Sequence, residues 1–195
     1  LPGSPDALLA QADFLRSRGQ WEQALLAYRK AQALAPGKAS PWLALGDAYR
    51  ERADYAAAQE AYQTANRLEP GNPAGLLGLG LVAQAQGAFD RAGGYFRQAA
   101  ALDQSQAEPW LNLGALAVQR NTLEDAKAFY EQASRAEPTN PAGAIGLGQV
   151  WLSQGAFSEA ETHLQQAVAV APMSGVAHQA LGQLYQARGD AAGAL

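Results

Sequence analysis

Apolar and small residues recur along this chain in two helical registers. Between residues 42 and 49 they fall at i, i+3, i+4 and i+7, which places them on one face of an α-helix. A second register begins soon afterwards, where Ala58, Tyr62 and Ala65 again fall on one face of a helix. The pattern predicts a unit of two helices joined by a tight turn. The anchors of the first helix are Trp42, Leu45, Gly46 and Tyr49.

Both registers return at a constant spacing of 34 residues, with no insertion. "WLALGDAY" begins at 42, "LLGLGLVA" at 76, "WLNLGALA" at 110 and "AIGLGQVW" at 144, with weaker copies at 8 and 178. Internal repeats of this length are typical of stacked helical hairpins. The chain is therefore predicted to be all-α, with five full repeats and a partial sixth. The expected repeats are 5–38, 39–72, 73–106, 107–140, 141–174 and 175–195, in one array covering 1–195.

Residues that favour turns and helix starts separate the predicted helices. The two helices of a repeat should be joined by a residue in the left-handed conformation, and glycine or asparagine stands there in all repeats except one, which has Ala53. Asp54 and Thr122 are expected to cap second helices, Thr122 within a capping box. The residues expected to cap first helices, each directly before a proline in the first turn, are Ser40, Asn72 and Asn140. The expected turn residues are Gly19, Gly87, Asn121, Gly155 and Gly189.

These features resemble the tetratricopeptide repeats (TPR). The family signature W-x₂-L-G-x₂-Y, A-x₃-F, P is matched in the second repeat, with tyrosine in place of phenylalanine. The resemblance covers residues 5–195 and implies a right-handed α-solenoid whose first helices line a concave groove. Pentatricopeptide repeats are the nearest alternative, but this acidic chain lacks the basic face that RNA binding needs. The matching residues are Trp42, Leu45, Gly46, Tyr49, Ala58, Tyr62 and Pro70.

Close-set glycines in "PAGLLGLG", beginning at Pro73, raise the alternative of a phosphate-binding loop. Gly80 and Gly148 occupy the same repeat position as Gly46, where a small residue lets the two helices of a repeat approach closely. A phosphate loop would follow a strand, and no strand pattern precedes these glycines. The surplus glycines should each cost about 1 kcal/mol in a helix interior, so the third repeat is expected to be the least stable.

Composition excludes several classes of function. The 195 residues carry a net charge of −4, which disfavours nucleic acid as a partner. The absence of cysteine excludes disulfides and thiolate metal sites. No apolar run is long enough to predict membrane insertion, and no signal peptide is visible. Cytoplasm and periplasm are both compatible, and a composition rich in Ala, Gln and Gly but poor in Lys favours a bacterial source.

Candidate catalytic and metal-binding groups are few. His163 and His178 have no second ligand at metal-binding spacing, and His178 occupies the packing position of Trp42. The carboxylate pairs Glu124–Asp125 and Glu159/Glu161 lie on second helices, where we expect them to be solvated. We therefore expect no enzyme activity, no metal and no cofactor.

The resemblance implies that positions 2, 5, 9 and 12 of each first helix face the groove, giving a surface that is charged, then apolar, then rich in amides. The hypothesis is that Leu77, Leu81, Leu111 and Val118 form a docking strip for a peptide or partner helix. The alternative, equally weighted, is that the position-5 leucines pack against adjacent first helices. The expected groove residues are Leu43, Asp47, Arg50, Leu77, Leu81, Gln84, Leu111, Asn112, Val118, Ile145 and Gln149.

A non-catalytic protein–protein interaction scaffold is accordingly the expected function. Self-association end to end is one alternative, because the sixth repeat stops early and would leave Leu181 and Tyr185 partly uncovered, so that a homo-oligomer could form there. An accessory domain of a larger enzyme, such as a glycosyltransferase, is the other. Asn112 is the only asparagine at its repeat position, so the asparagine ladder of glycosyltransferase-linked arrays is not supported.

Overall fold

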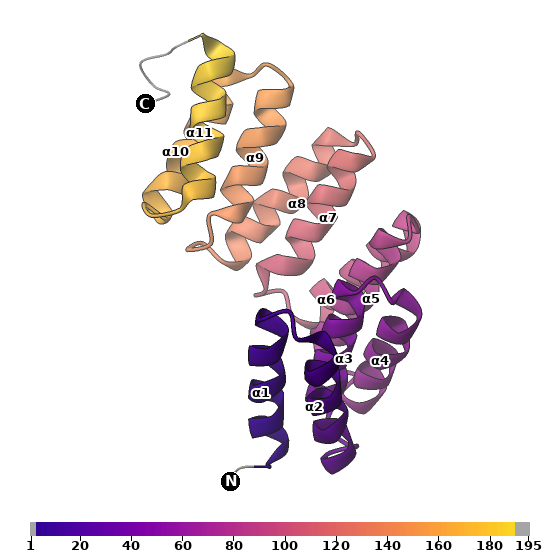
Figure 1. The fold of residues 1–195 in the computed structure, drawn as a ribbon. Helices are drawn as coiled ribbons and strands as arrows, with labels where there is room; N and C mark the ends of the chain where they lie inside the picture. Colours follow the sequence, from indigo (N-terminus) through magenta and orange to yellow (C-terminus); the bar gives the residue numbers. More distant parts are fainter. Residues whose placement is uncertain (1–2, 190–195) are drawn as a thin grey trace. The chain divides into compact units, whose positions relative to one another are not determined.

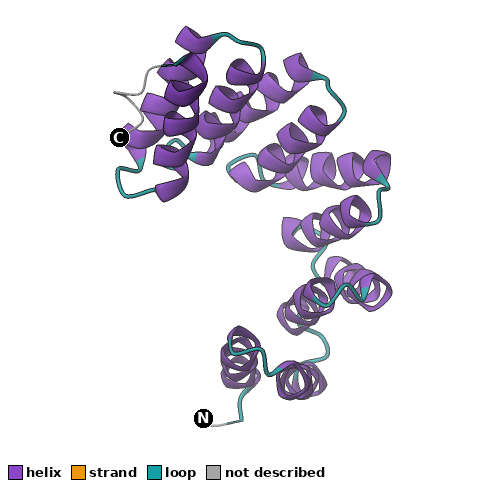
Figure 2. Ribbon diagram, turned by 45° about the horizontal axis from the view of Figure 1, so that its top comes forward, coloured by secondary structure: helices purple, strands orange, loops and turns teal. Residues whose placement is uncertain are grey.

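The computed structural model describes residues 3–189, and within that range every regular element is an α-helix (Figures 1 and 2). This confirms the all-α prediction. The helices are α1 (Pro5–Ser17), α2 (Trp21–Leu34), α3 (Ala39–Glu51), α4 (Tyr55–Leu68), α5 (Pro73–Ala85), α6 (Phe89–Leu102), α7 (Ala107–Gln119), α8 (Leu123–Ala136), α9 (Ala142–Ser153), α10 (Phe157–Val170) and α11 (Gly175–Arg188).

Two compact units make up the chain, Leu1–Leu102 and Asp103–Leu195. In the first unit the pairs α1/α2, α3/α4 and α5/α6 stack in order, so that α3 packs on α2 and α5 on α4. The second unit repeats this with α7/α8, α9/α10 and α11. The predicted helix-turn-helix repeats are thus confirmed within each unit, whereas one array running through both stays a prediction. The second helix of the sixth repeat lies outside the described residues.

Left-handed residues end the first helix of every complete described pair. The backbone φ is +72° at Gly19, +74° at Gly87 and +73° at Gly155, and +59° at Asn121. Ala53, the exception in sequence, has the same conformation with φ +59°. The turn geometry therefore imposes the left-handed backbone even where the residue does not favour it.

Helix caps follow the sequence at three positions and depart from it at two. The side chains of Asp54, Asn72 and Asn140 each accept a hydrogen bond, at 3.0–3.2 Å, from a backbone N–H of the following turn. The capping box expected at Thr122 is wrong, because its hydroxyl donates instead to a carbonyl of the preceding helix, at 3.3 Å. Ser40 is not a cap either, because α3 begins one residue earlier and places Ser40 inside its first turn.

Glycines are located where aromatic rings approach a helix backbone. The ring of Tyr62 in α4 lies between Gly46 of α3 and Gly78 of α5, and a Cβ atom at Gly46 would come within 2.6 Å of that ring. Gly80 faces the ring of Phe96 in the same way. This confirms the prediction that a small residue allows the two helices of a repeat to approach closely. It also accounts for "PAGLLGLG", whose glycines are buried inside a helix.

The same arrangement recurs 68 residues later. In the second unit the ring of Tyr130 lies between Gly114 of α7 and Gly146 of α9. These glycines remove the side chains that would separate the helices, and α4 packs on α5, and α8 on α9, more extensively than α2 on α3. Gly94 is different: a Cβ atom there would meet nothing within 4 Å. The sequence therefore contains both glycines required by packing and a glycine that packing does not require.

Candidate functional site

First helices lie side by side in each unit and present one face of the unit. In the first unit that face carries a polar cluster built from α3 and α4. The Tyr62 hydroxyl donates to Asp47 Oδ1 at 2.6 Å, and Arg50 Nε donates to the Tyr62 hydroxyl at 3.3 Å. One repeat earlier, the Tyr28 hydroxyl donates to Asp13 in the same way. The predicted groove residues Asp47 and Arg50 are thus brought together by a buried tyrosine.

Carboxylates dominate the exposed part of this polar cluster. Arg16 Nη1 lies 3.0 Å from Glu51 Oε1, which joins α1 to α3. The side chains of Arg16 and Arg50 are 27% and 30% exposed, whereas those of Asp13 and Asp47 are 56% and 46% exposed. The two arginine side chains are therefore more buried than the two aspartates, although each aspartate uses Oδ1 to accept from a tyrosine hydroxyl.

Tyr62→Phe is expected to lower the free energy of unfolding by about 1–2 kcal/mol, because the mutation removes a hydrogen bond to a charged acceptor. The matched control is Tyr130→Phe, expected to change it by less than about 0.5 kcal/mol, since Ala115 and Val118 stand where Asp47 and Arg50 do in the other unit. Urea unfolding of both variants measures the difference. Equal losses would show that the Tyr62–Asp47 bond adds no stability.

Burial, followed by the hydrogen bond to Asp47, raises the pKa of the Tyr62 hydroxyl above its ordinary value of 10.0. A tyrosine hydroxyl whose pKa is higher in the folded than in the unfolded protein makes its full contribution to stability at pH values below the unfolded pKa. That contribution is lost as the pH rises above about 10. Wild-type protein should therefore lose part of its stability in alkali, and Tyr62→Phe should lose less, because Tyr28, whose pKa is raised in the same way, remains.

Burial at position 5 of the first helices differs from repeat to repeat. Leu43 and Leu111 are half-buried, whereas Leu77 is 6% exposed and Ile145 is 8% exposed. Leu77 and Ile145 therefore offer almost no surface to a partner, which matches the packing alternative for this position. On α5 the remaining predicted groove residues, Leu81 and Gln84, are half-buried.

In the second unit the corresponding face is mainly uncharged. Val118 is 42% exposed on α7, and Gln149 is exposed on α9. The side-chain amide of Asn112 donates to the Glu108 carbonyl at 3.0 Å, so it turns back onto its own helix. Helix α11 continues the face with the exposed amides Gln179, Gln183 and Gln186. This face of the second unit therefore consists mainly of apolar side chains and amides.

His178 and Glu161 make contacts that hold the fold together, whereas Glu124, Asp125 and Glu159 are exposed, as expected. His178 Nε2 lies 2.8 Å from the carbonyl oxygen of Pro172, and Trp42 Nε1 donates to the carbonyl of Pro36 at 3.3 Å in the equivalent place. Glu161, expected to be solvated, instead accepts from Tyr185 and pairs with Arg188 at 2.8 Å. Among residues 3–189, no three His, Cys, Asp or Glu side chains gather where they could hold a metal.

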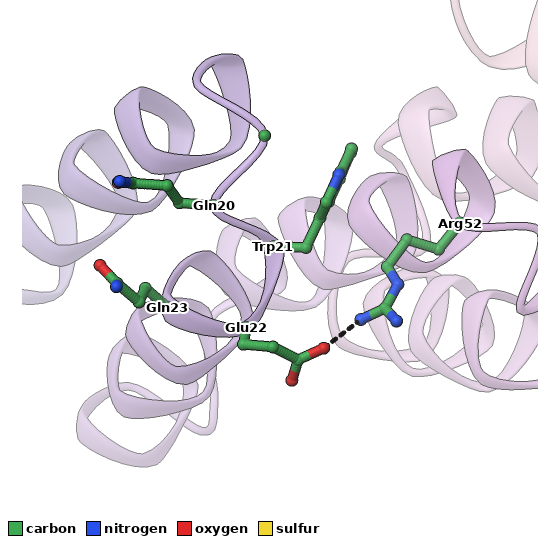
Figure 3. A pocket seen from close by; sticks show the side chains of 6 residues that line it. Gln20, Trp21, Glu22, Gln23 and Arg52 are labelled. Atoms are coloured by element: carbon green, nitrogen blue, oxygen red, sulfur yellow. Dashed lines mark hydrogen bonds and ion pairs between the residues drawn. The ribbon is translucent and has the colours of Figure 1, made fainter.

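A shallow hollow of about 360 Å³ opens where α2 begins and α3 ends (Figure 3). Glu22 and Arg52 meet across it at 2.9 Å, beside Trp21 and two glutamines. Sequence reasoning missed this hollow because its residues lie outside the predicted groove positions. The available signal was Trp21, a large aromatic residue at a helix start, which is half-buried in the structure. Its lining contains no serine, threonine, cysteine or histidine. In the part of the chain that the structure covers, no helix has the length and hydrophobicity needed to cross a bilayer.

Comparison with known structures supports the same fold. PilF from Pseudomonas aeruginosa is 20% identical with a TM-score of 0.78, covering 97% of this chain and 86% of that chain. Yeast Tom70 is 19% identical with a TM-score of 0.83; the match covers 95% of this chain but only 40% of Tom70. YrrB, described as a TPR protein with an unusual peptide-binding site, is 21% identical with a TM-score of 0.60, covering 89% and 90%.

Comparison of sequences identifies the family of the chain more directly. No curated protein matches it. The family model described as the Cilia and flagella-associated protein 70 C-terminal domain matches residues 3–195, nearly the full length. Together with the stacked helix pairs and their 34-residue period, this match shows that the chain belongs to that family of tetratricopeptide-repeat domains.

Proposed function

We propose that this chain is a non-catalytic interaction module that binds a peptide or helical segment of another protein on the faces of its first helices. The observation that supports this most strongly is the face of the second unit. There Val118 is 42% exposed, and Leu111 and Leu152 are half-exposed on neighbouring first helices. Contiguous apolar side chains on a surface tend to mark binding sites.

The chemistry of this face fits a segment that is mainly uncharged. Apolar side chains of the segment would pack against Leu111, Val118 and Leu152. The exposed amides of Gln149 and Gln179 carry both donors and acceptors, as a peptide backbone requires. YrrB, which shares the fold, is described as having a peptide-binding site. In the first unit, the negatively charged side chains of Asp13 and Asp47 would favour a partner segment that carries positive charge.

The test is the double variant Leu111→Glu/Val118→Glu. Two carboxylates on this face would have to be desolvated on binding, so capture of any partner should fall at least tenfold, or about 1.4 kcal/mol. Leu77 and Ile145 are left unchanged because a charge at a buried position would unfold the protein. Quantitative affinity capture with wild-type and variant protein measures the loss.

Leu102→Glu is the matched control, since Leu102 is 43% exposed and lies on a second helix. Proteins that bind the proposed face should be captured by wild type and by this control, but not by the double variant. Circular dichroism checks that all three proteins are equally helical. The proposal fails if all three folded proteins capture the same set in equal amounts.

A further inference from the structure

Two aromatic rings pack on one another between the helices of the fourth repeat. The rings of Trp110 in α7 and Phe129 in α8 are stacked, with their centres 6.4 Å apart and their planes 25° apart. Aromatic pairs at this separation are worth more than the area that they bury. These residues occupy the fourth and twenty-third positions of their repeat, so a ring from the second helix covers a ring of the first.

The second repeat has the same tryptophan without the covering ring. Trp42 of α3 occupies the fourth position, but Ala61 of α4 stands where Phe129 does. Tyr95 and His163 occupy this position in the third and fifth repeats, so those repeats also have a ring there. The second repeat therefore combines an aromatic platform with the loss of the side chain that would cover it.

A hollow of about 260 Å³ lies at this place in the structure. A cavity of about 150 Å³ is large enough to hold benzene. The hollow can therefore accommodate one aromatic side chain together with part of the backbone that carries it. Its lining comes from three packed helices of the first unit, and consists of Arg29 and Gln32 of α2, Trp42, Leu45 and Tyr49 of α3, and Ala57, Glu60 and Ala61 of α4.

The first repeat offers an internal comparison. It also has alanine at the twenty-third position, Ala27, and a hollow of about 220 Å³ lies there as well. Leu8 and Leu15 take the places that Trp42 and Tyr49 have in the second repeat. Alanine at this position thus accompanies an open hollow in both repeats, but of these two only the second has an aromatic platform.

Hydrogen bonds hold both rings of the platform in place. Trp42 Nε1 donates to the carbonyl of Pro36 at 3.3 Å, and Arg29 Nη2 donates to the Tyr49 hydroxyl at 2.9 Å. Trp42 and Tyr49 are half-buried, so part of each ring remains accessible. A surface whose side chains are already fixed loses less conformational entropy when a partner binds.

We propose that this hollow binds an aromatic side chain from a segment of another protein, which packs on Trp42 as Phe129 packs on Trp110. Every helix that borders the hollow is present in the structure, since α2, α3 and α4 all contribute to its lining. The space is therefore left by the small side chain of Ala61 and not by a missing neighbour.

The polar residues of the hollow favour a segment without net charge. Arg29 and Glu60 carry opposite charges on either side of the platform. Among residues 3–189, the side chains of Gln32 and Glu60 make no hydrogen bond or ion pair. They remain able to bind the peptide N–H and C=O groups next to the aromatic residue.

Another protein fits this hollow better than a second copy of the chain. Phe14 is the most exposed aromatic side chain among residues 3–189, at 59%. The guanidinium of Arg18 lies 5.6 Å from the centre of its ring. A second copy would have to give up this cation–π contact to insert Phe14 into the hollow.

The hollow and the proposed groove use different sides of α3. The residues of α3 that line the hollow are at positions 4, 7 and 11 of the repeat, whereas the groove residues Leu43, Asp47 and Arg50 are at positions 5, 9 and 12. With about 3.6 residues per turn, the two sets point in different directions. Each site can therefore be tested without the other.

The probe is the blocked peptide Ac-Gly-Gly-Phe-Gly-Gly-NH2, which is uncharged and has a single aromatic side chain. Amide and indole N–H chemical shifts of the full chain are followed during titration. The shifts should centre on Trp42, Tyr49 and Ala61. Peptides with alanine, lysine or glutamate in place of the phenylalanine should bind at least tenfold more weakly, because they lose the buried ring.

Two opposite substitutions test the role of the missing ring. Ala61→Phe supplies the ring in the second repeat and should abolish the shifts. Phe129→Ala removes it in the fourth repeat and should create a second site for the same peptide at Trp110. Circular dichroism checks that both variants are as helical as the wild type.

Trp42→Leu provides a second way to remove the site if Ala61→Phe does not fold. The third repeat has leucine at this position, Leu76, so the change is compatible with the repeat. It removes the platform and should also abolish binding. The groove variant Leu111→Glu/Val118→Glu should bind the peptide normally, which separates this proposal from the proposed function.

No shifts with the phenylalanine peptide, or shifts that persist in folded Trp42→Leu protein, would overturn the proposal. So would folded Phe129→Ala protein without a new site at Trp110. Tighter binding of the lysine or glutamate peptide would show that the hollow selects a charge and not a ring. Dimers in sedimentation equilibrium that Phe14→Ala dissociates would make a second copy the occupant, and the inference of a different protein would then fail.

Discussion

Leu184→Ala is expected to lower the free energy of unfolding of its unit by about 2–5 kcal/mol, whereas Phe14→Ala should cost about 1 kcal/mol or less. The two residues occupy the same position of their repeats, and phenylalanine is the larger side chain. Leu184 is fully buried, while Phe14 is 59% exposed. Truncating Leu184 leaves a cavity between α10 and α11, and truncating Phe14 removes surface that is already in water.

Hydrogen exchange measures this contrast, because repeat proteins open locally and each variant should affect its own helices. Faster exchange is expected in α10 and α11 of Leu184→Ala, with α1 and α2 of Phe14→Ala little changed. Wild-type protein under the same conditions provides the reference for both. A loss in Phe14→Ala as large as that in Leu184→Ala would mean that the Phe14 side chain is covered in solution.

Gly78→Ala should destabilise the first unit by about 1–3 kcal/mol, the usual cost of forcing extra volume into a packed core. Its new methyl group would overlap the ring of Tyr62, which Gly46 confines on the other side. Alanine is otherwise the better helix former by about 1 kcal/mol, so the loss would come entirely from this contact. Thermal unfolding of the two proteins gives the difference.

Gly94→Ala is the matched control, since it makes the same change in a helix of the same unit. A Cβ atom at Gly94 meets nothing within 4 Å, so this variant should gain up to about 1 kcal/mol. Opposite signs are therefore expected for one chemical change. If Gly78→Ala proved as stable as Gly94→Ala, the close fit of Tyr62 against α5 would not be a constraint on this fold.

The low stability expected for the third repeat stays a prediction, but the structure changes its reason. Gly75 and Gly78 let α5 approach α4, so their cost in helix propensity is offset by packing. Gly94 has no such compensation. We therefore expect α6 to be the weaker helix of this repeat, and Gly94→Ala to slow its hydrogen exchange.

Sequence alone determined the repeat, the helix pairs, the turns and the small residues at positions such as Gly80. These features follow from interactions within one helix or one turn, where i, i+3 and i+4 spacing and left-handed glycines carry the information. The charged groove residues Asp47 and Arg50 were also predictable as neighbours, because they lie three residues apart on one helix. Ser40 and Thr122 show the limit even at short range, since the helix start shifted at Ser40 and the hydroxyl of Thr122 found another acceptor.

Only the tertiary structure decided which groove residues are available to a partner. Leu43 and Leu77 occupy the same repeat position, yet Leu77 is buried and Leu43 is half-exposed. The difference depends on how closely neighbouring helices approach, which depends in turn on rings and glycines in other repeats. The exposure of Phe14 and the burial of Leu184, which occupy the same repeat position, were likewise decided by the surroundings of each helix. Periodicity specifies a helix face, but burial depends on what covers that face.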